Sequence, residues 1–206
     1  MCGISGIIEL DNNKVIDLSD LSKMNKAIVH RGPDDEGLYL NKEKNVGYGF
    51  RRLSIIDIKF GHQPMSDSEE NIWIVFNGEI YNHNELRKVL INRGHHFKTK
   101  CDTEVIIYAY KEWGRECIHK LRGMFAFSIY DRIKKELFIV RDRIGIKPLY
   151  FSKSGSRIFF SSETKAILAL RKNNNVNLDE EAFYHYLTLC VAPAKSTMFD
   201  GIKKLK

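Results

Sequence analysis

The sequence predicts an α+β fold in which two antiparallel sheets pack face to face and helices cover them. Three observations favour this class. Helical segments stand between groups of short strand-like segments, and these groups show no strand–helix–strand alternation. From residue 123 onward the chain is strongly β, with two hairpin-like pairs of strands. No glycine loop of the phosphate-binding type is present.

The first half of the chain contains one amphipathic helix between strands. Residues 3–7 form a strand-like run of small and branched residues, and we expect a buried strand there. Residues 19–29 carry apolar side chains at helical spacing. Strands are expected at 36–40 and 46–50, and a polar loop at 61–71. The apolar run 72–76 suits a strand that is covered on both faces.

In the second half, Gly78 is expected to end that apolar strand, and Asn82 is expected to cap a helix that continues to about Arg93. A further helix is predicted over 104–113, with Asp102 as a candidate N-cap. The remaining strands are predicted at 124–130, 136–141, 149–152 and 157–161, and short helices at 163–170 and 179–189.

Length and composition indicate one domain, residues 2–190, followed by a linker, residues 191–206, that leads toward another unit. No apolar run approaches the ~18 residues that a membrane helix needs, and the N-terminus lacks the features of a signal peptide. The four cysteines form no CxxC pair, so we expect a cytoplasmic protein without a disulfide framework or a zinc site.

The net charge of +7 is spread along the chain and accompanies no nucleic-acid-binding motif. It is therefore interpreted as solvated surface, and neither a nucleic acid nor a membrane is expected as a partner. An anionic protein domain nearby remains an alternative.

Cys2 is the candidate nucleophile. If Met1 is removed, this residue carries a thiol and a free α-amine, whose pKa values of ~8.5 and ~7.7–8.0 allow the amine to take the thiol proton near neutral pH. An ordinary buried core cysteine is the alternative. If Met1 persists, the amine is part of a peptide bond, and we expect an inactive precursor.

Five further residues supply what hydrolysis of an amino-acid amide requires. Asn77 and the backbone N–H of Gly78 could stabilise an oxyanion, although an Asn-Gly turn is the alternative. Arg52 offers a planar fork for an α-carboxylate. Its neighbour Arg51 would point the opposite way in an extended segment. Glu79 and Asp102 are candidates for holding an α-ammonium group.

The segment His30–Asp34 contains Gly32 and Pro33 and is expected to be a loop that holds one shape near the site, with Arg31 and Asp34 able to pair across it. A helix stop or a surface turn is the alternative. No serine elbow, HExxH motif or metal-spaced cluster competes with this set, so no metal site is expected.

Taken together, these motifs resemble the N-terminal glutaminase domain of glutamine-dependent asparagine synthetases, a class II glutamine amidotransferase of the N-terminal-nucleophile hydrolase superfamily. The resemblance spans essentially the whole chain. The matching segments are Met1–Ile4, His30–Asp34, Arg52–Asp57, Asn77–Asn82, Asp102–Glu104, Leu121–Phe127 and Arg141–Tyr150.

The resemblance implies a four-layer αββα sandwich and a reaction that converts glutamine to glutamate through a γ-glutamyl thioester on Cys2. It implies Asn77 and Gly78 at the oxyanion and Arg52 on the glutamine carboxylate. The glutamine amino group would lie between Glu79 and Asp102, and the pocket beside Arg52 would be lined by Leu53, Ser54, Ile55 and Ile56.

The resemblance also implies that ammonia passes to a C-terminal, ATP-dependent synthetase domain that is absent from these residues and that usually converts aspartate to asparagine. ATP and Mg²⁺ are expected only there, and no cofactor is expected in this domain. Related amidotransferases use other acceptors, and some relatives have lost the thiol and serve as docking domains. The sequence leaves the acceptor and a homodimeric state open.

Overall fold

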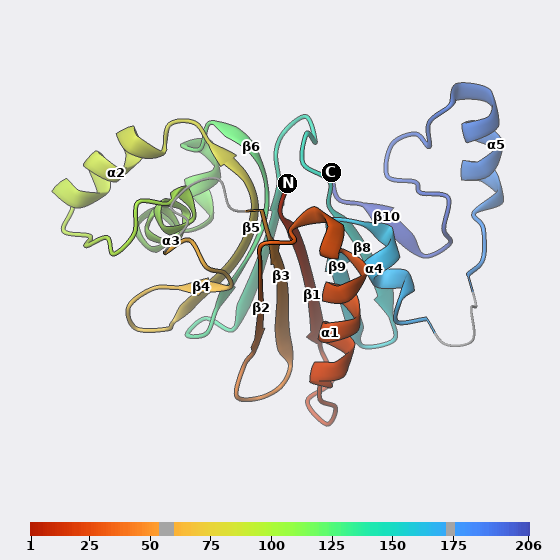
Figure 1. Ribbon diagram of the computed structural model, residues 1–206, viewed down its shortest axis with the longest axis horizontal. Helices are drawn as coiled ribbons and strands as arrows, with labels where there is room; N and C mark the ends of the chain where they lie inside the picture. Colours follow the sequence, from red (N-terminus) through yellow and green to blue (C-terminus); the bar gives the residue numbers. More distant parts are fainter. Residues whose placement is uncertain (54–59, 172–175) are drawn as a thin grey trace.

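The computed structural model describes residues 1–53, 60–171 and 176–206. Two antiparallel sheets face each other in the middle of the molecule, and helices lie on their outer sides (Figure 1). The expected αββα sandwich is confirmed.

The larger sheet has the strand order β10-β8-β9-β1-β3-β2. Its strands are β1 (Gly3–Glu9), β2 (Asp35–Leu40), β3 (Val46–Arg52), β8 (Tyr150–Ser154), β9 (Arg157–Ser161) and β10 (Ile202–Lys204). The central strand β1 is fully buried. On one edge it pairs with β3, with Gly3 opposite Arg51, and on the other edge it pairs with β9. The site described below lies where β1 begins.

The smaller sheet has the order β4-β5-β6-β7, formed by β4 (Met65–Ser66), β5 (Ile72–Ile80), β6 (Gly123–Asp131) and β7 (Glu136–Arg141). Strand β4 covers only the first part of β5, with Met65 opposite Ile74. Among the described residues, no strand pairs with the rest of that edge of β5.

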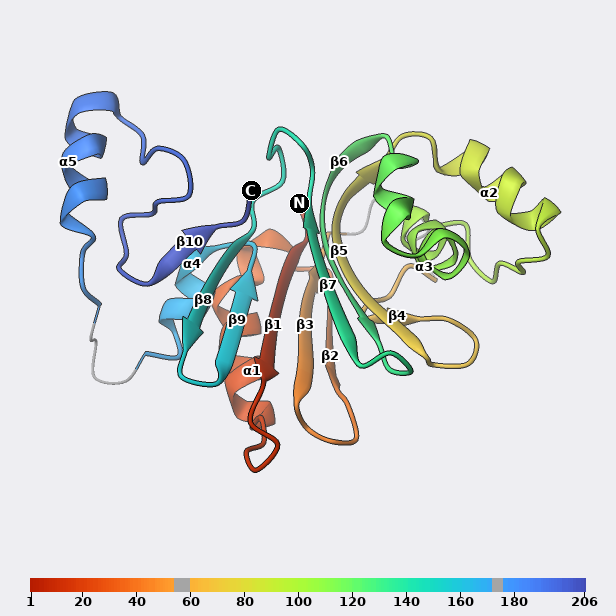
Figure 2. The ribbon, with the colours of Figure 1, turned by 180° about the vertical axis from the view of Figure 1, so that it is seen from behind.

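Helices α2 (His83–Asn92) and α3 (Asp102–Trp113) lie on the outer face of the smaller sheet, and α1 (Leu18–Ala27) and α4 (Thr164–Leu168) lie on the outer face of the larger one (Figure 2). Three apolar clusters fill the spaces between these layers. The middle cluster lies between the two sheets and includes Ile4, Phe50, Val75 and Phe160. Short 3₁₀ segments, Val29–Arg31 and Gly114–His119, follow α1 and α3.

Three local expectations are corrected by the structure. Gly78 does not end β5, which continues to Ile80 because it pairs with β6 over its whole length. Asn82 forms no side-chain cap on α2 and instead bonds the Lys120 carbonyl and the Arg122 N–H. Asp102 is the first residue of α3 rather than its N-cap, which is Cys101.

The C-terminal residues differ from the linker expected over 191–206. Residues Ile202–Lys204 form β10, which pairs with β8 at the edge of the larger sheet, and Ile202 is buried. Helix α5 (Glu180–Leu189) stands beside this edge, away from the two helical layers (Figure 1). The last strand of the sheet is therefore supplied by residues beyond the expected domain boundary.

Candidate active site

Three strands each bring one polar side chain to the same end of the space between the sheets. Side chains alternate between the two faces of a strand, so residues two positions apart share a face. Cys2, Arg52 and Asn77 each lie two residues from a side chain of the middle apolar cluster, namely Ile4, Phe50 and Val75. The two-residue alternation that buries the apolar side chains between the sheets therefore also places these three polar side chains in one region, at the end of that space.

These side chains share a cavity of about 190 Å³. This is below the ~300–1,000 Å³ typical of sites for drug-sized ligands and suits a metabolite the size of an amino acid. The cavity lining includes Cys2, Arg52, Leu53, Asn77, Gly78, Glu79 and Asp102. The structure thus brings together all the described residues of the predicted site; Ser54, Ile55 and Ile56 lie outside the described residues.

Leu53 contacts the side chain of Cys2, and Arg31 contacts its backbone. Its Sγ lies 3.6 Å from the carbonyl oxygen and 3.5 Å from the backbone nitrogen of Leu53. Its own carbonyl oxygen accepts a 2.9 Å hydrogen bond from Nε of Arg31. Burial raises the pKa of the Cys2 thiol, against the opposing effects of the Leu53 backbone and nearby positive charges. A base is therefore needed to remove the thiol proton at neutral pH.

Met1 occupies the mouth of this cavity, and its Sδ lies 3.0 Å from Nζ of Lys147. In this form the nitrogen of Cys2 is a peptide amide and cannot act as a base. Loss of Met1 would create an α-amine on the same residue as the thiol.

Asn77 provides a hydrogen-bond donor that the protein does not use. The residue is 1% exposed, and among the described residues its Nδ2 has no hydrogen-bond partner. A buried donor without a partner costs about 1–3 kcal/mol, so such a group is expected to bind something.

Gly78 offers a backbone N–H at the unpaired edge of β5. The N–H groups of Phe76 and Ile80, two residues on either side, point away from β6 and bond to side chains. Backbone alternation directs the Gly78 N–H to the same edge, and Gly78 lines the cavity. The Asn77 side chain and the Gly78 N–H therefore form a pair of donors for an oxyanion.

Glycine is required at position 78 mainly by the fold. A Cβ there would lie 2.3 Å from the Met124 carbonyl oxygen and 2.8 Å from Cα of Phe125, both on the neighbouring strand. Close contact with β6 therefore requires glycine at this position, in addition to the role expected for its N–H group.

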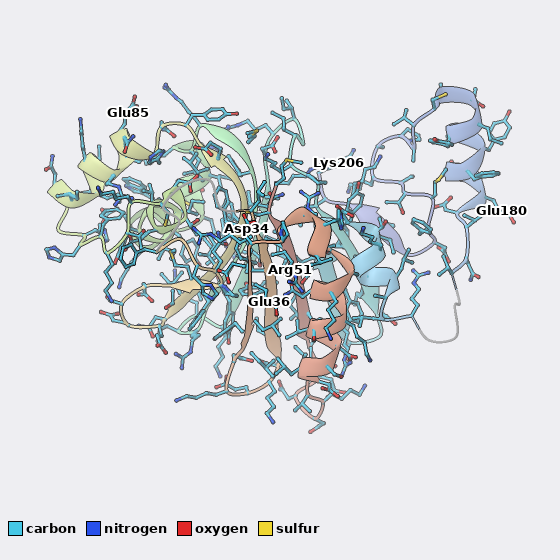
Figure 3. The ribbon with its side chains drawn as sticks, viewed as in Figure 1. Asp34, Glu36, Arg51, Glu85, Glu180 and Lys206 are labelled. Carbon is cyan, nitrogen blue, oxygen red and sulfur yellow. The ribbon has the colours of Figure 1, made fainter. Side chains whose placement is uncertain are left out.

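The side chains of Arg51 and Arg52 lie on opposite faces of the larger sheet, as expected for consecutive residues of a strand. Arg52 is 6% exposed and lines the cavity. Arg51 points to the outer face, where it forms a 2.7 Å ion pair with Glu36 and donates to the carbonyl of Asn25 in α1 (Figure 3). Of the two guanidinium groups, that of Arg52 is therefore the one that lines the cavity.

Asp102 and Glu79 are the acidic groups of the cavity. Asp102 is 5% exposed, and its Oδ2 accepts a 3.0 Å hydrogen bond from the Ile80 N–H. Burial raises the pKa of Asp102, and the charge of Glu79 acts in the same direction. A buried carboxylate with a second negative charge beside it favours a cation nearby, such as an ammonium group.

The loop His30–Asp34 packs against the end of β3. A Cβ on Gly32 would lie 2.4 Å from the backbone nitrogen of Arg52, and the Asp34 N–H donates to the Arg52 carbonyl. Arg31 does not pair across the loop, because it bonds instead to Cys2 and, at 3.0 Å, to Glu163. The loop therefore fixes both the nucleophile and Arg52.

Three buried polar residues of the cavity were not predicted as site residues, namely Lys147, Gln63 and Thr103. Lys147 is 5% exposed and follows a turn in which the Asp142 carboxylate accepts the N–H groups of Ile146 and Lys147. The only sequence signal for Lys147 was that it lies within Arg141–Tyr150, one of the segments that resemble the family. Gln63 is 5% exposed, and its place in a polar stretch gave no sign of burial.

Over residues 1–53, 60–171 and 176–206 the structure contains no group of three or more His, Cys, Asp or Glu residues arranged to hold a metal ion. The four cysteines are free. None of the described helices is both long and apolar enough to cross a membrane.

Comparison with known families decides the assignment. The model of the family described as "glutamine amidotransferase domain" matches residues 1–206. The chain belongs to this family. The fold and the cavity described above are therefore those of a glutamine amidotransferase domain.

Curated relatives of this amidotransferase domain include two microbial enzymes. The glutamine-hydrolysing asparagine synthetase 1 of Bacillus subtilis strain 168 is 42% identical over 208 residues, which cover all of this chain and 32% of the relative. A putative asparagine synthetase 2 of Methanocaldococcus jannaschii is 39% identical over 224 residues, which cover all of this chain and 42% of the relative. The chain thus spans about a third of the length of such relatives.

A solved structure supports the fold of the amidotransferase domain. Glutamine phosphoribosylpyrophosphate amidotransferase from B. subtilis superposes with a TM-score of 0.65 and 21% identity, over 81% of this chain and 43% of that one. At this identity the likeness shows a shared sandwich fold and no more.

Proposed function

We propose that this amidotransferase domain hydrolyses L-glutamine to glutamate and ammonia through a thioester on Cys2, after removal of Met1. The observation that carries the proposal is the buried Nδ2 of Asn77, which has no hydrogen-bond partner in the described part of the chain and shares a cavity with Cys2 and Gly78. A thiol beside unused oxyanion donors is the arrangement that acyl transfer needs.

The first half of the reaction forms the thioester. The free α-amine of Cys2 takes the thiol proton, and Sγ attacks the side-chain amide carbon of glutamine. The carbonyl oxygen becomes an oxyanion that accepts hydrogen bonds from Asn77 Nδ2 and the Gly78 N–H. The Cys2 ammonium group then returns its proton to the amide nitrogen, the C–N bond breaks, and ammonia leaves.

The second half releases glutamate. Water attacks the thioester carbon while the Cys2 amine accepts a proton from the water molecule. The same two donors stabilise the second oxyanion. The C–S bond breaks, the thiolate recovers its proton from the ammonium group, and glutamate carries the hydroxyl oxygen of the water.

Substrate recognition follows from the charges of the cavity. Arg52 binds the α-carboxylate through its planar fork, and Glu79 with Asp102 binds the α-ammonium group. One Asp102 oxygen is already used by Ile80, so the other is available to the substrate. Leu53, Ser54, Ile55 and Ile56 complete the proposed pocket. A free amino acid satisfies both charged ends, whereas a peptide or an acyl amide does not.

The ammonia is proposed to serve a C-terminal synthetase domain that uses ATP and Mg²⁺ to convert aspartate to asparagine. Relatives that are about three times longer and are named glutamine-hydrolysing asparagine synthetases support this. No cofactor is proposed within this domain. The protein is proposed to be cytoplasmic, without a nucleic acid or membrane partner, and a homodimer is one proposed assembly of the full-length enzyme.

Two alternatives differ in whether the glutamate-release assay separates them from this proposal: it excludes the second, and identifying the acceptor of the full-length enzyme separates the first. An amidotransferase that aminates another acceptor would share the glutamine chemistry and differ only in the second domain. A non-catalytic docking domain would release no ammonia from glutamine.

The direct test measures glutamate release by the wild-type protein, by Cys2→Ala and by Cys190→Ala, which removes an exposed thiol at the C-terminal end of α5. We expect wild-type and Cys190→Ala to be active and Cys2→Ala to be inactive. Hydrolysis that survives in Cys2→Ala, or a wild-type protein with Met1 removed that releases no glutamate, would refute the proposal.

A further inference from the structure

Strand β5 leaves an unusual edge beside the cavity. Its neighbour β4 pairs only with Trp73 and Ile74. Within the part of the chain that the structure describes, no strand pairs with the edge that the backbone groups of Phe76, Gly78 and Ile80 face. In an ordinary open edge these N–H groups would be satisfied by water. Here two of the three are satisfied by side chains.

Gln63 and Asp102 are these two side chains. Oε1 of Gln63 accepts the Phe76 N–H at 2.7 Å, and Oδ2 of Asp102 accepts the Ile80 N–H at 3.0 Å. Both acceptors are 5% exposed. The Gly78 N–H lies between the two and is the donor directed into the cavity.

Gln63 is itself held from two sides. Its Nε2 donates a 3.2 Å hydrogen bond to Oγ1 of Thr103 in α3. Its backbone carbonyl oxygen lies against Gly37 of β2, where a Cβ would come within 1.9 Å of that oxygen. Gln63 therefore bridges the larger sheet, the edge of β5 and the start of α3.

We propose that Gln63 is a positioning residue that replaces the missing strand at Phe76 and thereby fixes the direction of the Gly78 N–H toward the oxyanion. This deepens the proposed glutamine hydrolysis and rests on it. An error of about 1 Å in such a donor costs on the order of 100-fold in rate. The contribution of Gln63 is therefore expected in the transition state rather than in substrate binding.

Three variants separate the two hydrogen bonds of the Gln63 side chain. Gln63→Met has similar length and removes both. Gln63→Glu keeps an oxygen for the Phe76 N–H. Thr103→Val removes the partner of Nε2 and leaves the Oε1 bond in place.

For Gln63→Met we expect kcat for glutamine hydrolysis to fall about 10- to 100-fold with KM changed less than about twofold. Gln63→Glu and Thr103→Val should keep most of the wild-type kcat. The γ-aldehyde analogue of glutamine forms an oxyanion-like adduct with a thiol. In Gln63→Met, inhibition by this analogue should therefore weaken in parallel with the fall in kcat. Inhibition by glutamate should not change.

Two outcomes would overturn the proposal: an unchanged kcat in Gln63→Met, or a loss of glutamate binding as large as the loss of kcat. A wild-type protein without Cys2-dependent hydrolysis would instead refute the proposed function. In that case amide hydrogen exchange still tests the geometry, because Gln63→Met should accelerate exchange at Phe76. Unchanged exchange there would contradict the role of Gln63.

Discussion

Nε of Arg31 donates a 2.9 Å hydrogen bond to the carbonyl oxygen of Cys2, and the same guanidinium reaches Glu163 at 3.0 Å. The arginine thereby fixes the backbone of the nucleophile to the start of α4. A lysine cannot make both bonds in this geometry because it lacks the planar fork.

Arg31→Lys should therefore lower kcat for glutamine hydrolysis about tenfold, since one hydrogen bond to a charged group contributes about 1.5–3 kcal/mol. Steady-state kinetics provides the measurement. Arg115→Lys, at an exposed ion pair with Glu136, is the matched control and should be neutral. Equal kinetics in the two variants would show that Arg31 does not position Cys2.

The adjacent arginines of β3 make a second matched pair. Arg52→Lys should raise KM for glutamine about 10- to 100-fold, because the cavity loses its fork for the carboxylate. Arg51→Lys should leave KM nearly unchanged, since Arg51 binds Glu36 on the outer face. An increase in KM for Arg51→Lys as large as that for Arg52→Lys would contradict the assignment of Arg52 to the substrate.

Lys147 is expected to influence the pH dependence of the reaction. Lys147 lines the cavity, and its Nζ lies 3.0 Å from Sδ of Met1. The other charged groups nearby are Arg31, Arg52, Glu79, Asp102 and Asp142. Burial lowers the pKa of Lys147, and the charge of Arg31 adds to this. While Lys147 is charged, it disfavours a second positive charge on the Cys2 amine.

Lys147→Met should therefore raise the pKa of that amine and move the acidic limb of the kcat/KM profile about one unit to higher pH. Lys147→Arg should keep the wild-type profile. The pH–rate profiles of the three proteins provide the measurement. A shift to lower pH in Lys147→Met would have the wrong sign and would exclude this electrostatic role.

Glu9 gives a prediction for stability. Burial opposes its ionisation, but hydrogen bonds from Ser156 and Arg157 outweigh this and lower the pKa of Glu9 to about 2. A folded-state pKa below the unfolded-state value stabilises the fold above the unfolded pKa of ~4.3, and this contribution disappears as the pH falls toward 2.

Glu9→Gln should accordingly lower the melting temperature at pH 7 and have a much smaller effect near pH 2, the folded-state pKa. Thermal denaturation of both proteins at the two pH values measures this. The distance from Glu9 Oε2 to Arg157 Nε is 2.7 Å, so Arg157→Gln should behave in the same way. A destabilisation that is equal at both pH values would argue against an electrostatic origin.

Much of the site was predictable because strand periodicity directs it. The alternation that buries Ile4, Phe50 and Val75 also places Cys2, Arg52 and Asn77 on the inner face. The same argument separated Arg51 from Arg52. Local pattern is sufficient here because each residue continues a strand that the apolar residues already define.

The remaining features depend on contacts between distant segments. Asp102 looked like a helix cap, but its partner is the Ile80 N–H, 22 residues away. Gln63 was assigned to a polar loop, because no pattern within residues 61–71 indicates that its side chain bonds to the edge of β5. Likewise, β10 forms because β8 offers an edge, and a three-residue strand carries too weak a pattern to be predicted.

The central claim is that the thiol and the freed amine of Cys2 form one catalytic unit. It is tested most directly by intact-mass and peptide mass spectrometry of the protein after reaction with a thiol-alkylating analogue of glutamine. The account predicts a protein without Met1, one adduct on Cys2, and protection by glutamine. An adduct on Cys101, which lines the same cavity, or full activity in a protein that retains Met1, would contradict it.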